Sequence, residues 1–198
     1  MWSRLILLSL LISISEQTMA FEEPSFETLR ETRIFEIRQY APYLIVETEV
    51  KGEFSGVGNQ AFRSLFNYIS GSNNSVRSDD KQSEKISMTV PVTQVKTAEN
   101  TYRVSFLLPA KYSKETAPIP TSNVVSIREV PATLMASIRY NGNWSQQRYE
   151  KKLATLQTAL ELDNTYEAAG APIFARYNPP IIPSLFRHNE ILLPVRVK

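Results

Sequence analysis

Two halves of this chain carry the same order of sequence elements ninety residues apart, and this repeat limits the possible folds more than any other feature. Residues 35–40 (FEIRQY) and 125–130 (VSIREV) share the pattern apolar, polar, Ile, Arg, polar, apolar. A proline follows each of them, and then a run rich in strand-forming residues begins, at residues 43–50 and 133–140. The shared order and offset indicate a duplicated unit rather than chance similarity.

Each half continues with a glycine and an aromatic residue, a helical segment and two further strands. The glycine–aromatic pairs are Gly52 with Phe54 and Gly142 with Trp144. We predict helices over residues 55–70 and 145–162, and strands over residues 85–95, 101–108, 173–177 and 189–197. The resulting pattern is β-β-α-β-β, twice.

The two units, at about residues 33–109 and 123–198, fit into one domain of ordinary size in a chain of 198 residues. Two copies are too few for a solenoid, so each unit must bury its apolar faces against the other. We therefore predict a single α+β domain, in which sheets curve around a core and the helices lie outside.

The two predicted helices differ in the width of their apolar faces. Apolar residues of the first cover roughly 180° of arc, whereas a core-facing stripe needs about 100°, and the stripe of the second is only about 60° wide. The extra apolar surface on the first helix has two interpretations. Either the apolar, proline-rich loop of residues 177–186 covers it, or an apolar ligand lies against Phe62 and Phe66, with Arg63 or Asn59 at the rim.

The first twenty residues have the pattern of a secretory signal peptide. Arg4 supplies a positive charge, residues 5–14 form an apolar stretch too short to span a bilayer, and residues 18–20 (TMA) offer a cleavage site. We expect cleavage after Ala20, a mature domain over residues 21–198, and export to the periplasm or secretion, without stable membrane insertion. An uncleaved membrane anchor is the alternative.

Composition removes several classes of function. The 22 basic and 20 acidic side chains nearly balance, so no surface for nucleic acid is expected. The chain has no cysteine and one histidine, His188, which excludes thiolate nucleophiles, cysteine metal sites and histidine-rich zinc sites. The acids Glu47 and Glu49 share one strand face, which is more typical of a solvated surface than of a catalytic pair, and we predict no catalytic residues.

Five short motifs, in the same order, resemble those of the SOUL haem-binding protein family, and together they cover nearly the whole predicted mature chain. They are residues 35–42 (FEIRQYAP), 68–73 (YISGSN), 85–92 (KISMTVPV), 175–180 (ARYNPP) and 187–190 (RHNE), of which the third is the most specific. The resemblance implies a distorted, mostly antiparallel β-barrel flanked by two main helices, which agrees with the repeat. It also implies binding of haem or a related tetrapyrrole in a shallow apolar groove beside the first helix.

The resemblance further implies which residues line that groove. The positions on the family's helix motif are Asn59, Phe62, Arg63, Phe66 and Asn67. The late proline-rich loop would approach the same area. An aromatic lining would supply area and stacking for a flat ring, and an arginine at the rim would pair with a propionate.

The opening motif departs from the family in one place. Some members carry a histidine there that is proposed as an axial haem ligand, whereas this chain has Gln39. His188 and Met88 are the remaining candidates for the axial ligand. Each also has a non-ligand interpretation: His188 as an exposed polar residue, and Met88 as a side chain that fills the core. We therefore expect haem to be held without strong axial ligation or a metal site, in a monomeric, non-catalytic carrier or buffer.

The third motif contains an alternating run, residues 86–90, that ends at Pro91. We predict a strand there, with Met88 and Val90 facing inward and the proline at the edge or end of the ladder. On this interpretation the motif is architectural rather than a set of ligand contacts.

Two other classes of function stay open. An enzyme, or an effector-binding-type domain acting on another small hydrophobic ligand, would place a buried acid such as Glu47, Glu49 or Glu53 in a cleft. A protein-interaction module would instead use the broad apolar face of the first helix.

Overall fold

The computed structural model describes residues 21–76 and 82–198, so the predicted signal peptide, residues 1–20, lies outside the described residues. The elements follow one another as β1 Phe26–Glu31, β2 Glu36–Tyr40, β3 Tyr43–Lys51, α1 Val57–Ile69, β4 Asn73–Asn74, β5 Val92–Ala98, β6 Thr101–Leu107, β7 Ile119–Pro120, β8 Ser126–Val130, β9 Thr133–Asn141, α2 Gln146–Glu161, β10 Tyr166–Ala168, β11 Ile173–Arg176, η1 Ser184–Phe186 and β12 His188–Val197. Among the described residues, no helix has the length and apolar character needed to cross a bilayer.

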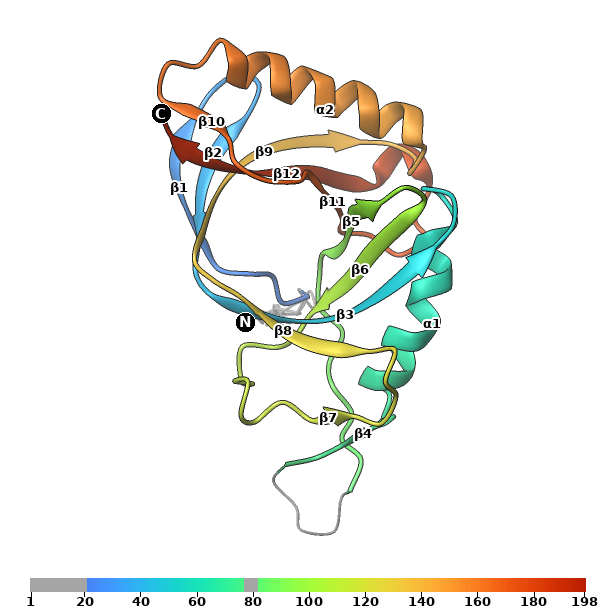
Figure 1. The fold of residues 1–198 in the computed structure, drawn as a ribbon. Coiled ribbons are helices and arrows are strands. Elements are labelled where there is room, and N and C mark those ends of the chain that lie inside the picture. The colour runs from blue at the N-terminus through green and yellow to red at the C-terminus, as the bar shows by residue number, and fades with distance from the viewer. Residues whose placement is uncertain (1–20, 77–81) are drawn as a thin grey trace, which may run out of the picture.

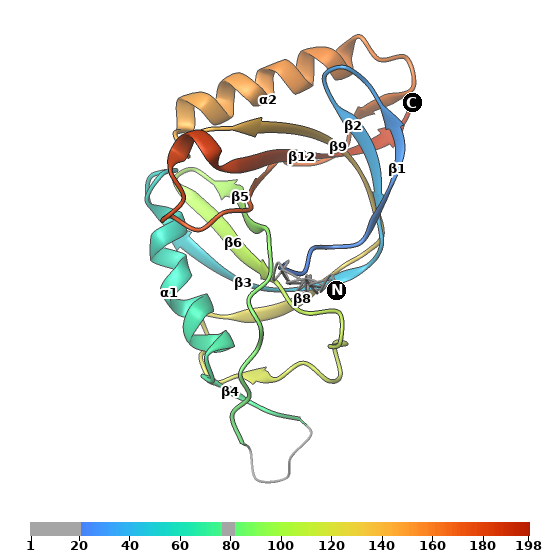
Figure 2. The same cartoon turned by 180° about the vertical axis from the view of Figure 1, so that it is seen from behind.

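Most of the strands form one antiparallel sheet that curls into a half-barrel, with α1 and α2 on its outer side (Figure 1). The strand order is β1-β2-β9-β12-β11-β5-β6-β3-β8, and β10 pairs with β12. From behind, α1 lies along β3 and β6, while α2 crosses β9 and β12 (Figure 2). The predicted α+β class is confirmed, and the barrel is open, because β1 and β8 are the two ends of the strand order.

The two halves of the chain interlock within this sheet. β2 of the first half pairs with β9 of the second, and β8 of the second pairs with β3 of the first. The registers are equivalent: Ile37 faces Ala136 in one pair, and Ile127 faces Val46 in the other, each ninety residues from its counterpart. The halves meet where β11 pairs with β5. The duplication is therefore visible in the hydrogen-bonded register as well as in the sequence.

The strand predicted over residues 85–95 is found only from Val92, where β5 begins. The prediction is wrong for residues 85–91, which belong to no named strand, although Thr89 forms an isolated bridge with Glu22. The N–H of Ile86 donates to the carbonyl of Ile69 at 2.8 Å, and the hydroxyl of Thr89 donates to the carbonyl of Leu107 at 2.7 Å. The N–H of Val90 also donates to the carbonyl of Glu22 at 2.9 Å. The ends of α1 and β6 and the residues before β1 thus supply the hydrogen bonds that a neighbouring strand would have given. An alternating sequence does not distinguish a segment that pairs with a neighbouring strand from one that bonds to the ends of other elements.

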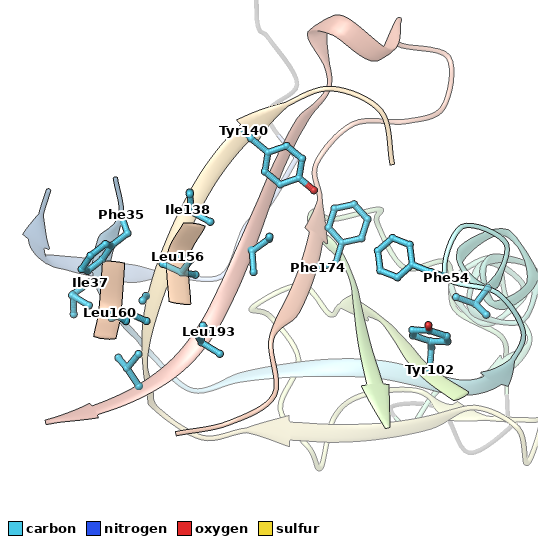
Figure 3. Packing of buried hydrophobic residues seen from close by; sticks show 14 residues of the cluster. Phe35, Ile37, Phe54, Tyr102, Ile138, Tyr140, Leu156, Leu160, Phe174 and Leu193 are labelled. Carbon is cyan, nitrogen blue, oxygen red and sulfur yellow. The ribbon is translucent and has the colours of Figure 1, made fainter. Parts of the chain in front are cut away.

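Each helix covers its own apolar core. Under α2, Leu156 and Leu160 are buried with residues of β2, β9 and β12, as the narrow predicted stripe requires (Figure 3). Under α1, Ala61 and Leu65 are buried against β3 and β6. The α2 core ends in an aromatic group that includes Phe174, in the region where the two halves meet.

Candidate functional site

A cavity of about 420 Å³ lies between α1, the segment before β5 and the proline-rich loop after β11. This volume falls within the range of small-molecule sites, about 300–1,000 Å³. Its lining is largely apolar and consists of Phe21, Gly58, Asn59, Phe62, Met88, Thr89, Val90, Val92, Trp144, Arg176, Tyr177, Asn178, Pro179 and Pro180. Because β5 and β11 both contribute, the cavity lies at the junction of the two repeats.

Two phenylalanines of α1 stay exposed beside this cavity. Phe62 is 37% exposed and Phe66 is 46% exposed. They are four residues apart, so they lie on one face of the helix, and their rings stack with centroids 5.5 Å apart and an angle of 14° between the planes. Phe62 also contacts Phe106 of β6 edge-on. The apolar surplus predicted for this helix is therefore present as a stacked pair that begins at the cavity wall.

The proline-rich loop forms the opposite wall and does not cover the two phenylalanines. Its residues 177–180 line the cavity, while Ile181, Leu185 and Phe186 are themselves exposed. The interpretation in which this loop hides the surplus apolar surface of α1 is therefore wrong. Apolar surface from both sides borders an open hollow.

The segment before β5 supplies a third side of the cavity. Met88 and Val90 are half-buried and line it. Thr89, between them, is buried and holds the backbone through its hydroxyl. The motif thus stabilises the backbone through Thr89 and also lines the cavity through Met88 and Val90.

Arg176, the last residue of β11, lines the cavity and has no carboxylate partner among the described residues. Its Nε and Nη2 atoms are buried and have no hydrogen-bond partner in the described part of the chain. Aromatic rings flank the guanidinium instead: its carbon is 5.4 Å from the ring centroid of Trp144 and 5.7 Å from that of Phe174. Burial lowers the pKa of Arg176 to about 10.

Gly58, in the first turn of α1, gives the guanidinium its space. A Cβ atom at this position would overlap Nη1 of Arg176. A residue with any side chain would push the guanidinium out of its place. The glycine of the helix and the arginine of the strand are therefore one structural unit.

Two further groups without a partner lie near this arginine. The indole Nε1 of Trp144 is buried and unpartnered among the described residues, and Trp144 lines the cavity. The hydroxyl of Tyr140 is also buried without a partner there, and Tyr140 is close enough for its charge to affect the pKa of Arg176. Arg187 lies over the Trp144 ring, 4.3 Å from its centroid. The cavity lining thus contains two side chains with buried, unpartnered N–H groups, Arg176 and Trp144, and the Tyr140 hydroxyl lies near the arginine outside the lining.

The five residues predicted to line the groove separate into two sets. Asn59 and Phe62 line the cavity, and Phe66 extends its apolar wall through the stacked ring. Arg63 is exposed and is not part of the lining. Asn67 borders a separate hollow of about 160 Å³ near the end of α1.

The two axial-ligand candidates also lie in different places. Met88 lines the cavity, whereas His188 does not. The His188 ring stacks on Tyr177, with centroids 4.2 Å apart, and its Nε2 is 3.0 Å from Oε1 of Glu190. The imidazole thus already has a carboxylate partner.

Glu190 is the centre of a buried polar network beside His188. Nη1 of Arg38 donates to its carboxylate at 2.8 Å, and the hydroxyl of Tyr177 donates at 2.9 Å. Burial by itself would raise the pKa of Glu190, but hydrogen bonds from His188 and Arg38 lower it to about 2. The network ties β2 to β12, and it keeps the Tyr177 hydroxyl engaged.

The acids that an enzyme would need are not in the cavity lining. Glu47 is buried, but Nε and Nη2 of Arg128 donate to it at 3.0 and 2.9 Å, so it is neutralised on the strand face. Glu49 and Glu53 are exposed. Among the described residues, no group of three or more acidic, histidine or cysteine side chains comes together as a metal site would require.

A second hollow, of about 500 Å³, occupies the equivalent place in the other half of the fold. Gln94 faces Phe174 at the centre of the β5–β11 pair, so Lys96 and Arg176, each two residues further along, hold equivalent positions. Each lines the hollow on its own side, but Lys96 is exposed. The duplicated fold therefore contains two related grooves. The basic residue at the equivalent position is exposed in one, whereas in the other its Nε and Nη2 atoms are buried.

Comparisons with known proteins agree with this geometry. The family model described as SOUL heme-binding protein matches residues 21–194. No curated protein matches the chain in sequence.

Solved structures with a similar fold come from several functional settings. The C-terminal domain of EcmrR has a TM-score of 0.62 at 13% identity, over 82% of this chain and 96% of that chain. A hydrolase from Listeria innocua has a TM-score of 0.56 at 13% identity, over 85% and 94% of the two chains. SAV2435, solved with bound tetraphenylphosphonium, has a TM-score of 0.50 at 9% identity, over 82% and 93%. At these identities the likeness concerns the fold.

Proposed function

The chain belongs to the SOUL heme-binding protein family, and on this premise we propose that it binds haem or a related tetrapyrrole in the cavity beside α1. The observation that carries the proposal is the stacked pair of Phe62 and Phe66, which stays exposed next to an open, largely apolar hollow. Large exposed aromatic side chains beside a cavity are typical of a ligand site rather than of a packed surface. A flat ring system would bury them and gain both area and stacking.

The cavity lining fits the ring of a tetrapyrrole better than it fits strong coordination of iron. Phe62, Trp144 and Pro179 offer apolar surface to a ring. Haem iron supplies redox or gas-binding chemistry when the protein provides a strong axial donor. Met88 and Tyr177 are the lining residues of a type that can ligate iron, but the Tyr177 hydroxyl donates to Glu190. His188 is outside the cavity lining and is bonded to Glu190. We therefore propose a carrier or buffer that also accepts metal-free rings.

We also propose that the protein works outside the cytoplasm as a monomer. The support is the signal-peptide pattern of residues 1–20, with cleavage expected after Ala20. The mass of the exported protein would then correspond to a chain that starts at Phe21. Light scattering over a range of concentrations tests the monomer.

The structural neighbours suggest other ligands, and the charges in this cavity argue against one of them. Tetraphenylphosphonium, bound by SAV2435, is a cation, whereas the ionised side chain that lines this cavity is the cation of Arg176. Like charges in a buried site disfavour binding. The hydrolase from Listeria innocua shares the fold at 13% identity, and in this chain the buried acid Glu47 is paired with Arg128 outside the cavity lining.

Titration with hemin tests the proposal, and the position of Trp144 provides a local signal. The chain has two tryptophans, and the expected cleavage after Ala20 removes Trp2, so Trp144, in the cavity wall, is the sole tryptophan of a chain that starts at Phe21. We expect a saturable change in the Soret band at micromolar hemin, with quenching of Trp144 emission over the same range. Absence of saturation would contradict the proposal, and a Soret change without quenching would place the ligand elsewhere.

A further inference from the structure

We propose that the part of this cavity lined by Arg176 and Trp144 is a carboxylate-recognition subsite, in which the guanidinium of Arg176 and the indole N–H of Trp144 bind a carboxylate of the ligand. The inference deepens the proposed function: it rests on that function for the identity of the ring, and it predicts that the ring must carry a free acid group. Neutral analogues of the same ring should bind much more weakly.

The first support is that these donors are buried and unsatisfied. Nε and Nη2 of Arg176 and Nε1 of Trp144 are buried without hydrogen-bond partners in the described part of the chain. Native structures leave few such groups without a functional reason, since a buried charge without a partner destabilises the fold. A ligand carboxylate would satisfy them together, because a guanidinium presents parallel N–H groups that match the two oxygens.

The second support is that the fold holds the guanidinium in place. Gly58 leaves space for it, and the rings of Trp144 and Phe174 flank it. A rigid cation loses little freedom on binding, so it discriminates between ligands better than a flexible surface charge. Arg63, the residue that the family motif suggested for this contact, is exposed on α1 and lacks such a frame.

The third support is an internal comparison that the duplication provides. Arg38 and Arg128 occupy equivalent positions in the two repeats, and each has its own carboxylate, Glu190 and Glu47 respectively. In both repeats the fold thus supplies an acid to a strand arginine, to the buried Arg38 and to the exposed Arg128. Arg176 is different, and its equivalent, Lys96, is exposed to solvent. An acid from outside the chain is the partner that this arginine lacks.

Metal-free porphyrins test the subsite without any contribution from iron. The full chain is titrated with mesoporphyrin IX, which has two propionates, and with its dimethyl ester. We expect the diacid to bind at least about tenfold more tightly than the diester, as the removal of a charge-assisted contact implies. Arg176→Met should lower affinity for the diacid by a similar factor and leave the diester within about twofold. Arg176→Lys, which keeps the charge, should retain part of the preference.

Two matched variants complete the design. Lys96→Met alters the equivalent basic residue of the other groove and should leave both affinities unchanged. Trp144→Phe keeps an aromatic ring but removes the N–H, so it should weaken the diacid alone, by about fivefold. Equal binding of diacid and diester to the wild type, or an undiminished preference in Arg176→Met, would overturn the subsite.

A simpler pair of probes separates failure of the subsite from failure of the tetrapyrrole proposal. If neither porphyrin binds, the proposed function is wrong, and the same variants are titrated with 1-pyrenebutyrate and 1-pyrenebutanol. A preference for the acid that disappears in Arg176→Met would support the subsite with a different ring. No preference in the wild type would refute it.

Discussion

Gly58 on α1 and Arg176 on β11 are in such close contact that a single methyl group on the glycine would overlap the guanidinium. Alanine normally stabilises a helix by about 1 kcal/mol relative to glycine. Here we expect Gly58→Ala to cancel that gain, because the arginine must move toward the cavity and lose its place between the aromatic rings. Hemin affinity should fall by about tenfold, measured by Soret titration.

Gly56→Ala is the matched control for this prediction. Gly56 lies immediately before α1, and a Cβ there would meet only the carbonyl of Glu53 at 3.7 Å, an ordinary contact. Its effect on the free energy of unfolding should stay below about 1 kcal/mol, and hemin affinity should not change. Equal affinities in the two variants would mean that the position of Arg176 does not matter for binding.

Arg176→Met should separate folding from binding. In the ligand-free protein the guanidinium is buried without a carboxylate among the described residues, and burial lowers its pKa to about 10. Replacing such a charge with an apolar side chain of similar length often stabilises a protein, by about 1–3 kcal/mol. We expect a melting temperature several degrees higher than that of the wild type, by thermal unfolding. The exposed Lys96→Met should change it little. A lower melting temperature for Arg176→Met would show that the arginine serves the fold itself.

Phe66→Asp should weaken hemin binding with little loss of stability. Phe66 is 46% exposed, so a charge there remains hydrated, yet it would replace one of the two stacked rings. Soret titration should show a loss of about tenfold or more. Leu162→Asp is the control, since Leu162 is 80% exposed at the end of α2. Unchanged affinity in Phe66→Asp would move the binding surface away from this face of α1.

The duplication made most of this fold predictable. Repeats with one offset gave the order of the strands and helices, and the equivalent registers of Ile37 and Ile127 show why. The strand prediction is wrong for residues 85–91 because their alternation reflects contacts with the ends of α1 and β6 and with Glu22 rather than with a neighbouring strand of the sheet. Local patterns report which side chains are buried, but they do not report what covers them.

The same limit explains which part of the site the sequence missed. Phe62 and Phe66 were predicted from the width of one helix face, which is a local property. Arg176 lies in the motif of residues 175–180, but its importance depends on the lack of a carboxylate partner among the described residues, which a sequence motif does not reveal. The glycine at position 58, opposite the arginine, was a further signal, although its meaning appears only when α1 packs against β11.

Glu190→Gln should destabilise the protein in a manner that depends on pH. Glu190 is buried and accepts hydrogen bonds from Arg38, Tyr177 and His188. Burial alone would raise its pKa, but the contacts with His188 and Arg38 hold the pKa at about 2, below the ordinary value of 4.5. Because the pKa is lower in the folded state, the carboxylate contributes its stability above pH 4.5, and this contribution is lost as the pH falls toward 2. At pH 7 the variant should lose about 3 kcal/mol, since the charge of Arg38 is no longer fully compensated.

Denaturant unfolding at pH 7, 4.5 and 2.5 checks this expectation, and a second ion pair provides the comparison. Glu167 pairs with Arg196 on the surface, where their side chains are 40% and 70% exposed, so Glu167→Gln should cost less than about 1 kcal/mol at each pH. The difference between wild type and Glu190→Gln should be largest at pH 7 and shrink at pH 2.5, as the wild-type carboxylate approaches protonation. A difference that stayed constant down to pH 2.5 would show that the geometry of the side chain, rather than its charge, holds β2 and β12 together at this point.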